Sequence, residues 1–337
     1  MDFVIQSDYA DYAGKTVKEF LRANVGLSRN MLIMLKNKSD GITVNHNRVT
    51  VRRVLALGDV LSLNYENIDE IHQDKSFVAE NRNLLGLLDI VYEDDFILAV
   101  NKPPDMPSHP SINHFDDTLA NLVVTYFRSK NSKSFYRAAN RLDKNTSGIV
   151  LIAKDKIMSA RLNNMMIRGD IKKTYIAVLD GNIDCLCDSV KLGEINENLA
   201  AVNGSLEYDP ETRTGRIVAP IRREHDSIIK RVCARDGDYS ETGFKVLKSG
   251  NHNHISVLEV YPKTGRTHQI RLHFCKIGLP LLGEDLYCGH VNQEYRMNRH
   301  ALHAYSLEFS HPENNKKITL TCELPDDIGS IIQVMEQ

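Results

Sequence analysis

Residues 140–155 read NRLDKNTSGIVLIAKD, in which a polar segment runs directly into the apolar stretch GIVLIA. The polar half carries Arg141 and Asp143, and the threonine, serine and glycine at 146–148 suit a tight turn. An apolar run that follows turn chemistry predicts a buried strand over 148–153. A carboxylate at the edge of a rigid strand is well placed for chemistry, although an aspartate that only caps its own turn fits the same local pattern.

Helices and strands alternate irregularly around this strand. Residues 87–103 (LLDIVYEDDFILAVNKP) predict a hairpin, and residues 173–178 (KTYIAV) predict a further strand. Apolar periodicity predicts helices over 118–128 and 159–167. This order of elements favours an α+β fold with a mixed sheet.

A smaller unit precedes these elements. Two short helices are predicted between residues 15 and 34, and short strands around an asparagine-rich turn are predicted after residue 42, the last of them over 60–63. The segment that follows is acidic and lacks apolar periodicity, which is typical of a solvated linker. We therefore predict a small domain at residues 1–65, an acidic linker at 66–87 and a large domain at 88–330.

The small domain contains a basic stretch. Between residues 29 and 53 it carries six basic residues and one acidic residue. Such a stretch attracts phosphate, while a solvated charged face would have the same composition. The basic residues are Arg29, Lys36, Lys38, Arg48, Arg52 and Arg53.

The overall composition is that of an ordinary globular chain. Of the 337 residues, 42% are hydrophobic and 26% are charged, which excludes a mainly disordered chain. The formal net charge of −2 gives no overall basic field, so nucleic-acid binding has to rest on local patches. No run approaches the roughly 18 apolar residues of a membrane span, and the first residues are acidic, so we expect a cytoplasmic protein. The six cysteines are dispersed, and we expect reduced thiols and no metal site.

A second informative segment, residues 263–278, reads KTGRTHQIRLHFCKIG. Apolar residues recur every three to four positions, and Thr267 can act as a cap, so we predict a helix. The start of this helix could hold an anion or pair with a carboxylate from elsewhere, although a surface helix would look similar. The polar side chains near its start are Arg266, His268, Gln269 and Arg271.

Two further segments carry no decisive local signal. Tyr175 lies within the predicted strand at 173–178, where a tyrosine is usually a core residue. Residues 185–213 are polar and lack regular apolar spacing, so we expect a surface excursion. The sequence has no phosphate-binding loop, dinucleotide fingerprint or HExxH metalloprotease motif.

Several of these segments together resemble the RluA family of RNA pseudouridine synthases. The motifs are NRLDKNTSGIVLIAKD, KTYIAV and TGRTHQIRLHF, with LAVNKPPDMPSHPS before them and GLPLLGEDLY and ALHAYSLEFSHP after them. The resemblance covers about residues 88–325. The first domain resembles the S4-type RNA-binding module of many members through SRNMLIMLKNKSDGITVNHNRVTVRRVLALGDVLSL. The resemblance implies a pseudouridine synthase fold, with a mixed and largely antiparallel sheet and flanking helices, preceded by a small α/β S4-like domain.

The resemblance also implies an activity and a set of roles. The family breaks the bond between uracil N1 and ribose C1′, turns the base and rejoins it through C5, without a cofactor or a metal. Asp143 matches the essential aspartate, acting as nucleophile at C1′ or as base at C2′, and the sequence leaves this choice open. Arg271 matches the arginine that pairs with it, and Tyr175 matches the tyrosine that stacks near the base and takes the C5 proton. Arg141 matches the residue that fills the space left by the extracted uridine.

The partner implied by the resemblance is RNA. Besides Arg141 and the basic residues of the small domain, we expect Arg266, His268 and Gln269 to contact it. The appended S4-like domain favours large-subunit ribosomal RNA over transfer RNA as the target, and we expect a monomer.

Two departures and two alternatives accompany this interpretation. Asn140 and Leu279 stand where the family more usually has histidines. The chain could be a non-catalytic RNA-binding or ribosome-assembly protein, which would have no need for Asp143, Tyr175 and Arg271 together. A carboxylate-based hydrolase would require a suitably spaced pair of carboxylates, and the sequence offers one convincing candidate.

Overall fold

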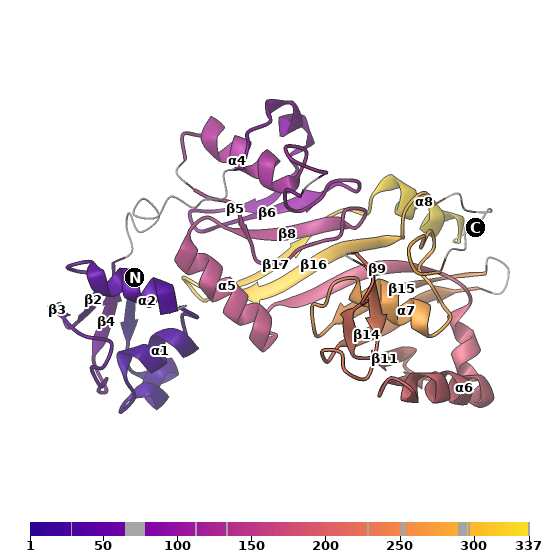
Figure 1. Cartoon of the computed structure of the whole chain (residues 1–337), viewed down its shortest axis with the longest axis horizontal. Coiled ribbons are helices and arrows are strands. Elements are labelled where there is room, and N and C mark those ends of the chain that lie inside the picture. The colour runs from indigo at the N-terminus through magenta and orange to yellow at the C-terminus, as the bar shows by residue number, and fades with distance from the viewer. Residues whose placement is uncertain are drawn as a thin grey trace.

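The computed structural model describes residues 1–27, 29–64, 78–111, 113–132, 134–227, 229–250, 254–288, 295 and 297–335. These residues form a small N-terminal body and a much larger second body (Figure 1). The predicted domain end at residue 65, and residues 66–77 of the predicted linker, lie outside the described residues.

The N-terminal body packs two helices on a small antiparallel sheet. The helices are α1 (Val17–Ala23) and α2 (Arg29–Asn37), preceded by the 3-10 helix η1 (Ser7–Tyr12). The strands, in their order across the sheet, are β1 (Asp2–Val4), β4 (Val60–Leu63), β2 (Ile42–Val44) and β3 (Asn47–Arg48). Helix α1 begins at a capping box, in which the Thr16 hydroxyl accepts from the Glu19 amide and the Glu19 carboxylate accepts from the Thr16 amide. The two predicted helices and the strand predicted over 60–63 are confirmed.

The second body is built on one large sheet of eleven strands. In chain order they are β5 (Ile90–Glu93), β6 (Ile97–Lys102), β7 (Arg137–Ala138), β8 (Ser147–Ala153), β9 (Lys172–Asp180), β10 (Ser205–Asp209), β11 (Thr214–Val218), β14 (Glu241–Ser249), β15 (Ile255–Pro262), β16 (Leu302–Ser310) and β17 (Lys317–Thr321). Across the sheet the order is β10-β11-β14-β15-β9-β16-β8-β6-β5, with β17 beside β16 and β7 beside β8. The pairing of β16 with β8 is parallel and the other pairings are antiparallel, so the predicted mixed, largely antiparallel sheet is confirmed.

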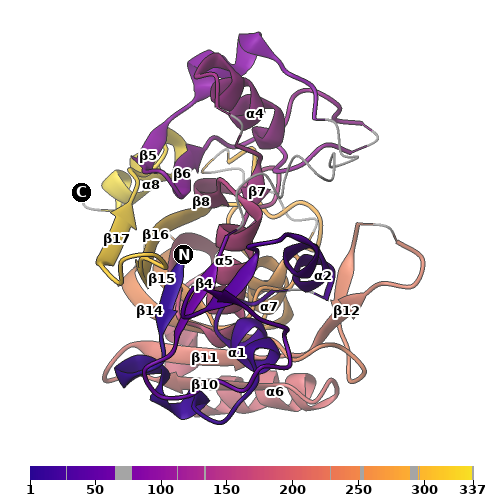
Figure 2. The ribbon, with the colours of Figure 1, turned by 90° about the vertical axis from the view of Figure 1, so that its left-hand side faces the viewer.

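Helices flank this sheet, and a separate hairpin stands beside it. The helices are α4 (Leu119–Ser129), α5 (Lys156–Arg168), α6 (Ser189–Ala200), α7 (Gln269–Lys276) and α8 (Asp326–Val334), with the 3-10 helices η2 (Arg82–Leu87) and η3 (Ile183–Cys187). The hairpin consists of β12 (Ile221–Arg223) and β13 (Arg231–Cys233), and it projects from the body in Figure 2. No helix within the described ranges combines the length and the apolar character needed to cross a membrane.

The central strand β8 is the strand predicted from GIVLIA. All seven of its residues are buried, as expected for a strand covered on both faces. Gly148 at its start has φ +114°, and a Cβ there would lie 2.3 Å from the Ala304 carbonyl oxygen of β16. Only glycine fits this close approach, and it brings the start of β8 against β16 directly after the Asp143 loop.

The N-terminal body contacts the second body through α5. Ile157 of α5 is 1% exposed and packs into the apolar core of the N-terminal body. The Asn164 Nδ2 donates to the Ala23 carbonyl (2.7 Å), and the Arg161 guanidinium lies over the Phe3 ring. The side chains of α5 thus contribute to both bodies.

Residues 185–213 differ from the prediction of a surface excursion. They form the end of η3, the helix α6 and the edge strand β10, and they bury Leu186, Leu199 and Leu206 in the main core. Each of these elements covers only the edge of the sheet and therefore contributes few apolar residues. For this reason the apolar periodicity of residues 185–213 did not predict the helix or the strand.

Two other expectations need correction. Cys275 and Cys288 form a disulfide, so the expectation of six reduced thiols is wrong; the chain returns from the end of α7 to bring these residues together across 13 positions. The predicted linker extended to residue 87, but the Asn81 amide donates to Thr125 of α4 (2.8 Å). Residues 79–87 therefore pack on α4, and their leucines at 84 and 85 are partly buried against the main apolar core.

Candidate active site

Asp143 lies in the loop that leads into β8, and β8 holds this loop through Asn140. The Asn140 Nδ2 donates to the Ile149 carbonyl (3.0 Å) and its Oδ1 accepts from the Leu151 amide (2.8 Å). This bridge is the local role of the asparagine that stands where a histidine is more usual. The Thr146 amide donates to the Asp143 carbonyl (3.1 Å), which closes the turn before β8.

The carboxylate of Asp143 faces away from its own turn. Its Oδ2 lies 3.5 Å from Arg271 Nη1 and 3.7 Å from His268 Nε2, and the side chain is 25% exposed. Both groups belong to the start of α7, so two segments 128 positions apart meet at this carboxylate. Because these contacts point outward from the loop, the alternative in which Asp143 only caps its own turn does not fit the geometry.

A buried lysine joins the Asp143 loop to the proline-rich loop after β6. Lys102 is 0% exposed, and its Nζ donates to the carbonyls of Pro103 (2.8 Å), Met106 (2.8 Å) and Lys144 (3.0 Å). Burial lowers the pKa of Lys102 to about 7, while the charge of Asp143 acts in the opposite direction. Through these three hydrogen bonds Lys102 ties the proline-rich loop to the loop that carries Asp143.

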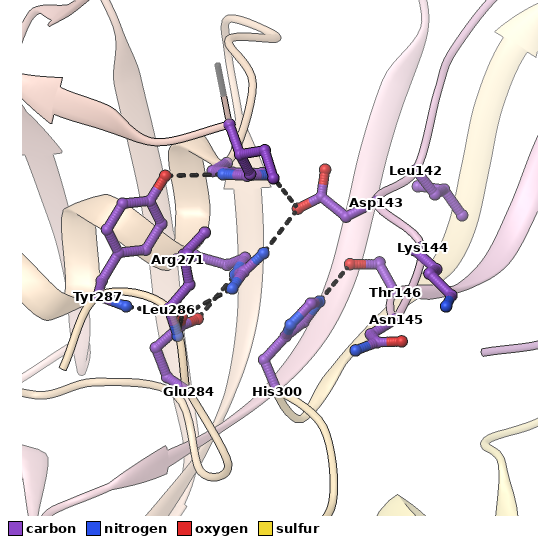
Figure 3. Close-up of polar contacts among 12 residues, drawn as sticks. Leu142, Asp143, Lys144, Asn145, Thr146, Arg271, Glu284, Leu286, Tyr287 and His300 are labelled. Carbon is purple, nitrogen blue, oxygen red and sulfur yellow. Dashed lines mark hydrogen bonds and ion pairs between the residues drawn. The ribbon is translucent and has the colours of Figure 1, made fainter. Parts of the chain in front are cut away.

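Arg271 is held by a buried carboxylate that the sequence interpretation missed. Its Nε donates to Glu284 Oε2 and its Nη2 to Glu284 Oε1, both at 2.7 Å (Figure 3). Arg271 is 5% exposed and Glu284 is 1% exposed. Burial works to lower the pKa of Arg271, but Glu284 and Asp143 outweigh it and raise the pKa, so the guanidinium stays charged. Both oxygens of Glu284 are engaged, so it does not supply the second free carboxylate that a hydrolase would need.

Figure 3 shows further polar groups on the two sides of Asp143. Tyr287 lies beside the Arg271 guanidinium, which is 5.5 Å from the ring centre. On the other side, His300 Nε2 lies 2.7 Å from Thr146 Oγ1. Burial lowers the pKa of His300 well below its ordinary value, so this histidine is a neutral support of the turn.

Tyr175 lies on β9 and belongs to the main apolar core of the second body. It is 9% exposed, and burial together with the charge of Asp143 raises its pKa. The neutral phenol is therefore the stable form near neutral pH. A neutral phenol presents an aromatic face and a hydroxyl, but little phenolate to act as a base.

The start of α7 differs from the predicted helix. The helix begins at Gln269, and the residue before it, His268, has left-handed backbone angles (φ 58°, ψ 19°) and no side-chain cap bond. The Gln269 Oε1 instead accepts from the Thr264 hydroxyl (2.7 Å) and the Arg266 amide (3.1 Å), and its Nε2 donates to the Glu241 carbonyl (2.8 Å). Gln269 is 4% exposed, so the structure places it in support of this loop and not at the surface where RNA would contact it.

The other residues predicted to contact RNA lie in two places. Arg141 and Arg266 are exposed near Asp143 and at the start of α7, with Arg266 Nη1 donating to Asp238 (3.1 Å). His268 is half-buried beside Asp143. In the N-terminal body Lys38 is half-buried and donates to Asn64 Oδ1 (2.8 Å). The other residues of that body predicted to contact RNA are all exposed, namely Arg29, Lys36, Arg48, Arg52 and Arg53.

Sequence reasoning missed Lys102, Glu284, Tyr287 and His300. All four fall in or beside the motifs that carried the resemblance, so position along the chain was an available signal. What distinguishes Glu284 from Asp285 is burial, since the Asp285 side chain is 74% exposed. Two adjacent acids in a loop give no periodicity from which that burial can be read.

Comparison with known proteins identifies the class. The RNA pseudouridylate synthase family matches residues 96–276. The "Uncharacterized RNA pseudouridine synthase YjbO" of Bacillus subtilis (strain 168) is 31% identical over 94% of this chain and 98% of its own length. The "Ribosomal large subunit pseudouridine synthase D" of Buchnera aphidicola subsp. Schizaphis graminum is 31% identical over 74% of each chain.

Solved structures agree on the fold. "Human RNA Pseudouridylate Synthase Domain Containing 4" superposes with a TM-score of 0.55 at 20% identity, over 75% of this chain and 96% of that one. The chain therefore belongs to the RNA pseudouridine synthases, as its resemblance to the RluA family implied. It is an isomerase that acts on RNA.

Proposed function

We propose that this protein converts specific uridines of large-subunit ribosomal RNA to pseudouridine and that Asp143 is the reacting group. The observation that carries the proposal is the state of Asp143, a partly exposed carboxylate that faces a buried and already paired arginine. In the overall reaction the N1–C1′ bond breaks and a C5–C1′ bond forms. The C5 carbon loses one proton and N1 gains one, so the product is an isomer of the substrate.

The two oxygens of Asp143 have different surroundings, which suggests different tasks. Oδ2 faces Arg271 and His268. We assign the reaction to Oδ1, which either adds to C1′ or removes the C2′ proton. Holding one oxygen in place leaves the other aimed at the ribose, and this orientation supplies a large part of the rate enhancement in such sites.

Arg271 orients the carboxylate of Asp143. Its Nη1 lies 3.5 Å from Asp143 Oδ2. Glu284 balances Arg271 in the absence of substrate, so the guanidinium is fixed in place before RNA arrives. Pre-organisation of this kind requires no rearrangement at the moment of reaction.

Tyr175 provides the aromatic surface against which the uracil rests. Because its pKa is raised, Tyr175 is protonated near neutral pH. It can therefore take up the C5 proton only if its own proton leaves in the same step. Replacement by Phe keeps the ring and replacement by Leu removes it, so the two variants separate stacking from proton transfer.

The target uridine has to leave its stack to reach Asp143. Extraction costs a few kcal/mol, and Arg141, exposed two residues before Asp143, fills the vacated position. The N-terminal body acts as an S4-like RNA-binding module through its exposed arginines and lysines. This assignment rests on charge, exposure and the sequence resemblance.

Ribosomal RNA is proposed as the target because several relatives carry the ribosomal large subunit in their names. Pseudouridine synthases D of Buchnera aphidicola and Neisseria meningitidis are 31% identical to this chain over 74% of its length. Such a target implies action in the cytoplasm. A transfer-RNA target is the second candidate, and the oligomeric state stays a prediction of monomer.

The test is release of tritium from RNA labelled at uracil C5, with ribosomal and transfer RNA from cells lacking the gene supplied separately. We expect release from the ribosomal fraction with the wild-type protein and none with Asp143→Asn. Mapping of the product then names the modified position. Release from transfer RNA alone would overturn the target, and equal release by Asp143→Asn would overturn the role of the carboxylate.

A further inference from the structure

We propose that His268 and Tyr287 are positioning residues that form a relay from strand β13 to Asp143, made of two hydrogen bonds and a 3.7 Å polar contact. The inference rests on the proposed function, because it assigns a task to the groups around the reacting carboxylate. It also changes the role of His268, which the sequence interpretation assigned to RNA contact.

The relay begins at the backbone of β13. The Arg231 amide donates to the Tyr287 hydroxyl oxygen (3.1 Å), and that hydroxyl lies 2.7 Å from His268 Nδ1. The His268 Nε2 lies 3.7 Å from Asp143 Oδ2. Four groups from four segments of the chain therefore follow one another from the hairpin to the reacting carboxylate.

The surroundings of His268 favour one tautomer of the neutral ring. The Tyr287 oxygen accepts from a backbone N–H, which leaves its own hydrogen to donate to Nδ1. In the neutral ring the remaining proton is then on Nε2, the nitrogen that faces Asp143. In the opposite tautomer, Nδ1–H and the Arg231 amide would both donate to the Tyr287 oxygen. The lone pair of Nε2 would then face the Asp143 carboxylate.

His268 acts as a neutral donor. Burial lowers its pKa; Asp143 acts to raise it, and Arg271 and Arg231 act to lower it further. A neutral N–H orients Oδ2 of Asp143 without adding a second full charge beside Arg271. The carboxylate therefore keeps its reactivity while one of its oxygens is held.

The backbone at His268 supports a functional role. Its φ of 58° lies in the left-handed region, which non-glycine residues rarely adopt. This conformation ends the loop and starts α7 one residue later, so it directs the imidazole toward Asp143. Strained backbone at such a position is commonly retained because it places a working side chain.

The relay begins on a hairpin that carries several basic side chains. Strand β13 belongs to the β12–β13 hairpin, which projects from the body and carries Arg222, Arg223, Lys230 and Arg231 (Figure 2). Through the Arg231 amide, the same hairpin holds the Tyr287 hydroxyl.

The first test compares Tyr287→Phe with the matched control Tyr126→Phe. Both lose one hydroxyl, and Tyr126 of α4 donates to Glu93 (2.6 Å), away from the site. For Tyr287→Phe we expect kcat at saturating RNA to fall about 10- to 100-fold, with RNA affinity and melting temperature close to wild type. Tyr126→Phe should leave kcat unchanged.

The second test separates positioning from packing. A glutamine at 268 can place its amide N–H near the position of the imidazole Nε2, whereas alanine cannot. His268→Gln should retain most of the kcat that His268→Ala loses, and the double variant Tyr287→Phe/His268→Ala should be no slower than His268→Ala alone.

The outcomes that overturn the relay are specific. Unchanged kcat in Tyr287→Phe, additive losses in the double variant, or a rise in KM with constant kcat would each contradict it. The last result would return His268 to the RNA-contact role. Failure of the proposed function itself would look different, because Asp143→Asn would then be as active as the wild type.

Discussion

The catalytic centre and the N-terminal body use charge in opposite ways. At the centre, Arg271 and Glu284 are almost fully buried and bind each other through two 2.7 Å hydrogen bonds. In the N-terminal body, Arg48, Arg52 and Arg53 are exposed, and Arg53 approaches Asp59 only at 3.7 Å. Buried charges keep a fixed geometry, and their electrostatic interaction is stronger in a low dielectric. Exposed charges remain available to bind a mobile polyanion.

This difference predicts a division of labour. Changes at the centre should affect kcat and stability, because they leave a buried charge or a donor without its partner. Changes in the N-terminal body should affect RNA affinity and its dependence on salt. The following predictions test that separation in order of decreasing effect.

The largest effect is expected for Asp143→Asn. Loss of the reacting carboxylate should lower kcat by at least about 10³-fold, since no other group replaces it. RNA affinity should change less than about threefold, because one carboxylate makes no phosphate contact. Single-turnover tritium release and filter binding measure the two quantities, and a loss of affinity equal to the loss of kcat would break the separation.

Glu284→Gln should follow, because it removes the buried carboxylate that forms two 2.7 Å hydrogen bonds with Arg271 and leaves only the longer contacts to Asp143 and Asp285. Removing one partner of such a pair costs about 3–5 kcal/mol of unfolding free energy, and glutamine retains part of the hydrogen bonding. We expect kcat to fall about 10- to 100-fold and the denaturation midpoint to drop clearly. The matched control is Asp285→Asn, whose side chain is 74% exposed and 3.6 Å from the same guanidinium. Equal effects of the two variants would show that burial of the pair is unimportant.

Lys102→Met tests the support of the Asp143 loop and predicts a pH dependence. Three buried carbonyls lose their donor, which costs about 1–3 kcal/mol. Burial lowers the pKa of Lys102 to about 7 in the folded chain, well below its unfolded value. Between these two pKa values the unfolded chain binds a proton that the folded chain lacks, so rising pH favours the folded wild type. The stability difference between wild type and variant should therefore grow from about pH 7 toward about pH 10 in urea titrations, and a constant difference would contradict the lowered pKa.

The smallest effect on chemistry is expected for the triple variant Arg48→Ala/Arg52→Ala/Arg53→Ala. RNA affinity should fall, and the slope of log affinity against log salt should decrease by roughly 0.7–0.9 for each phosphate that the variant no longer neutralises. The kcat at saturating RNA should stay within about twofold of wild type. Lys191→Ala, an exposed lysine on α6, is the control. An unchanged affinity in the triple variant would remove the N-terminal body from RNA binding.

Much of this arrangement could be predicted from local sequence. The strand β8 and the approximate positions of the predicted helices follow from turn chemistry and apolar periodicity, which report on neighbours in the chain. The proximity of Asp143 to Arg271 was implied only by the resemblance of the motifs to a known family.

The remainder depends on tertiary contacts. The burial of Glu284 beside exposed Asp285, the internal hydrogen bonds of Gln269 and the incorporation of residues 185–213 into the sheet edge are set by distant segments. The same holds for the left-handed backbone of His268, which no local signal in KTGRTHQIR reveals. Local rules carry no information about these contacts, because the partners lie far away in the sequence.

The role of Asp143 and that of the N-terminal arginines are tested together by tritium release at saturating C5-labelled RNA, with Asp143→Asn and the triple arginine variant measured side by side against wild type. We expect no release from Asp143→Asn and a near wild-type rate from the triple variant. Measurable turnover by Asp143→Asn, or a rate in the triple variant that saturating RNA fails to restore, would contradict these roles.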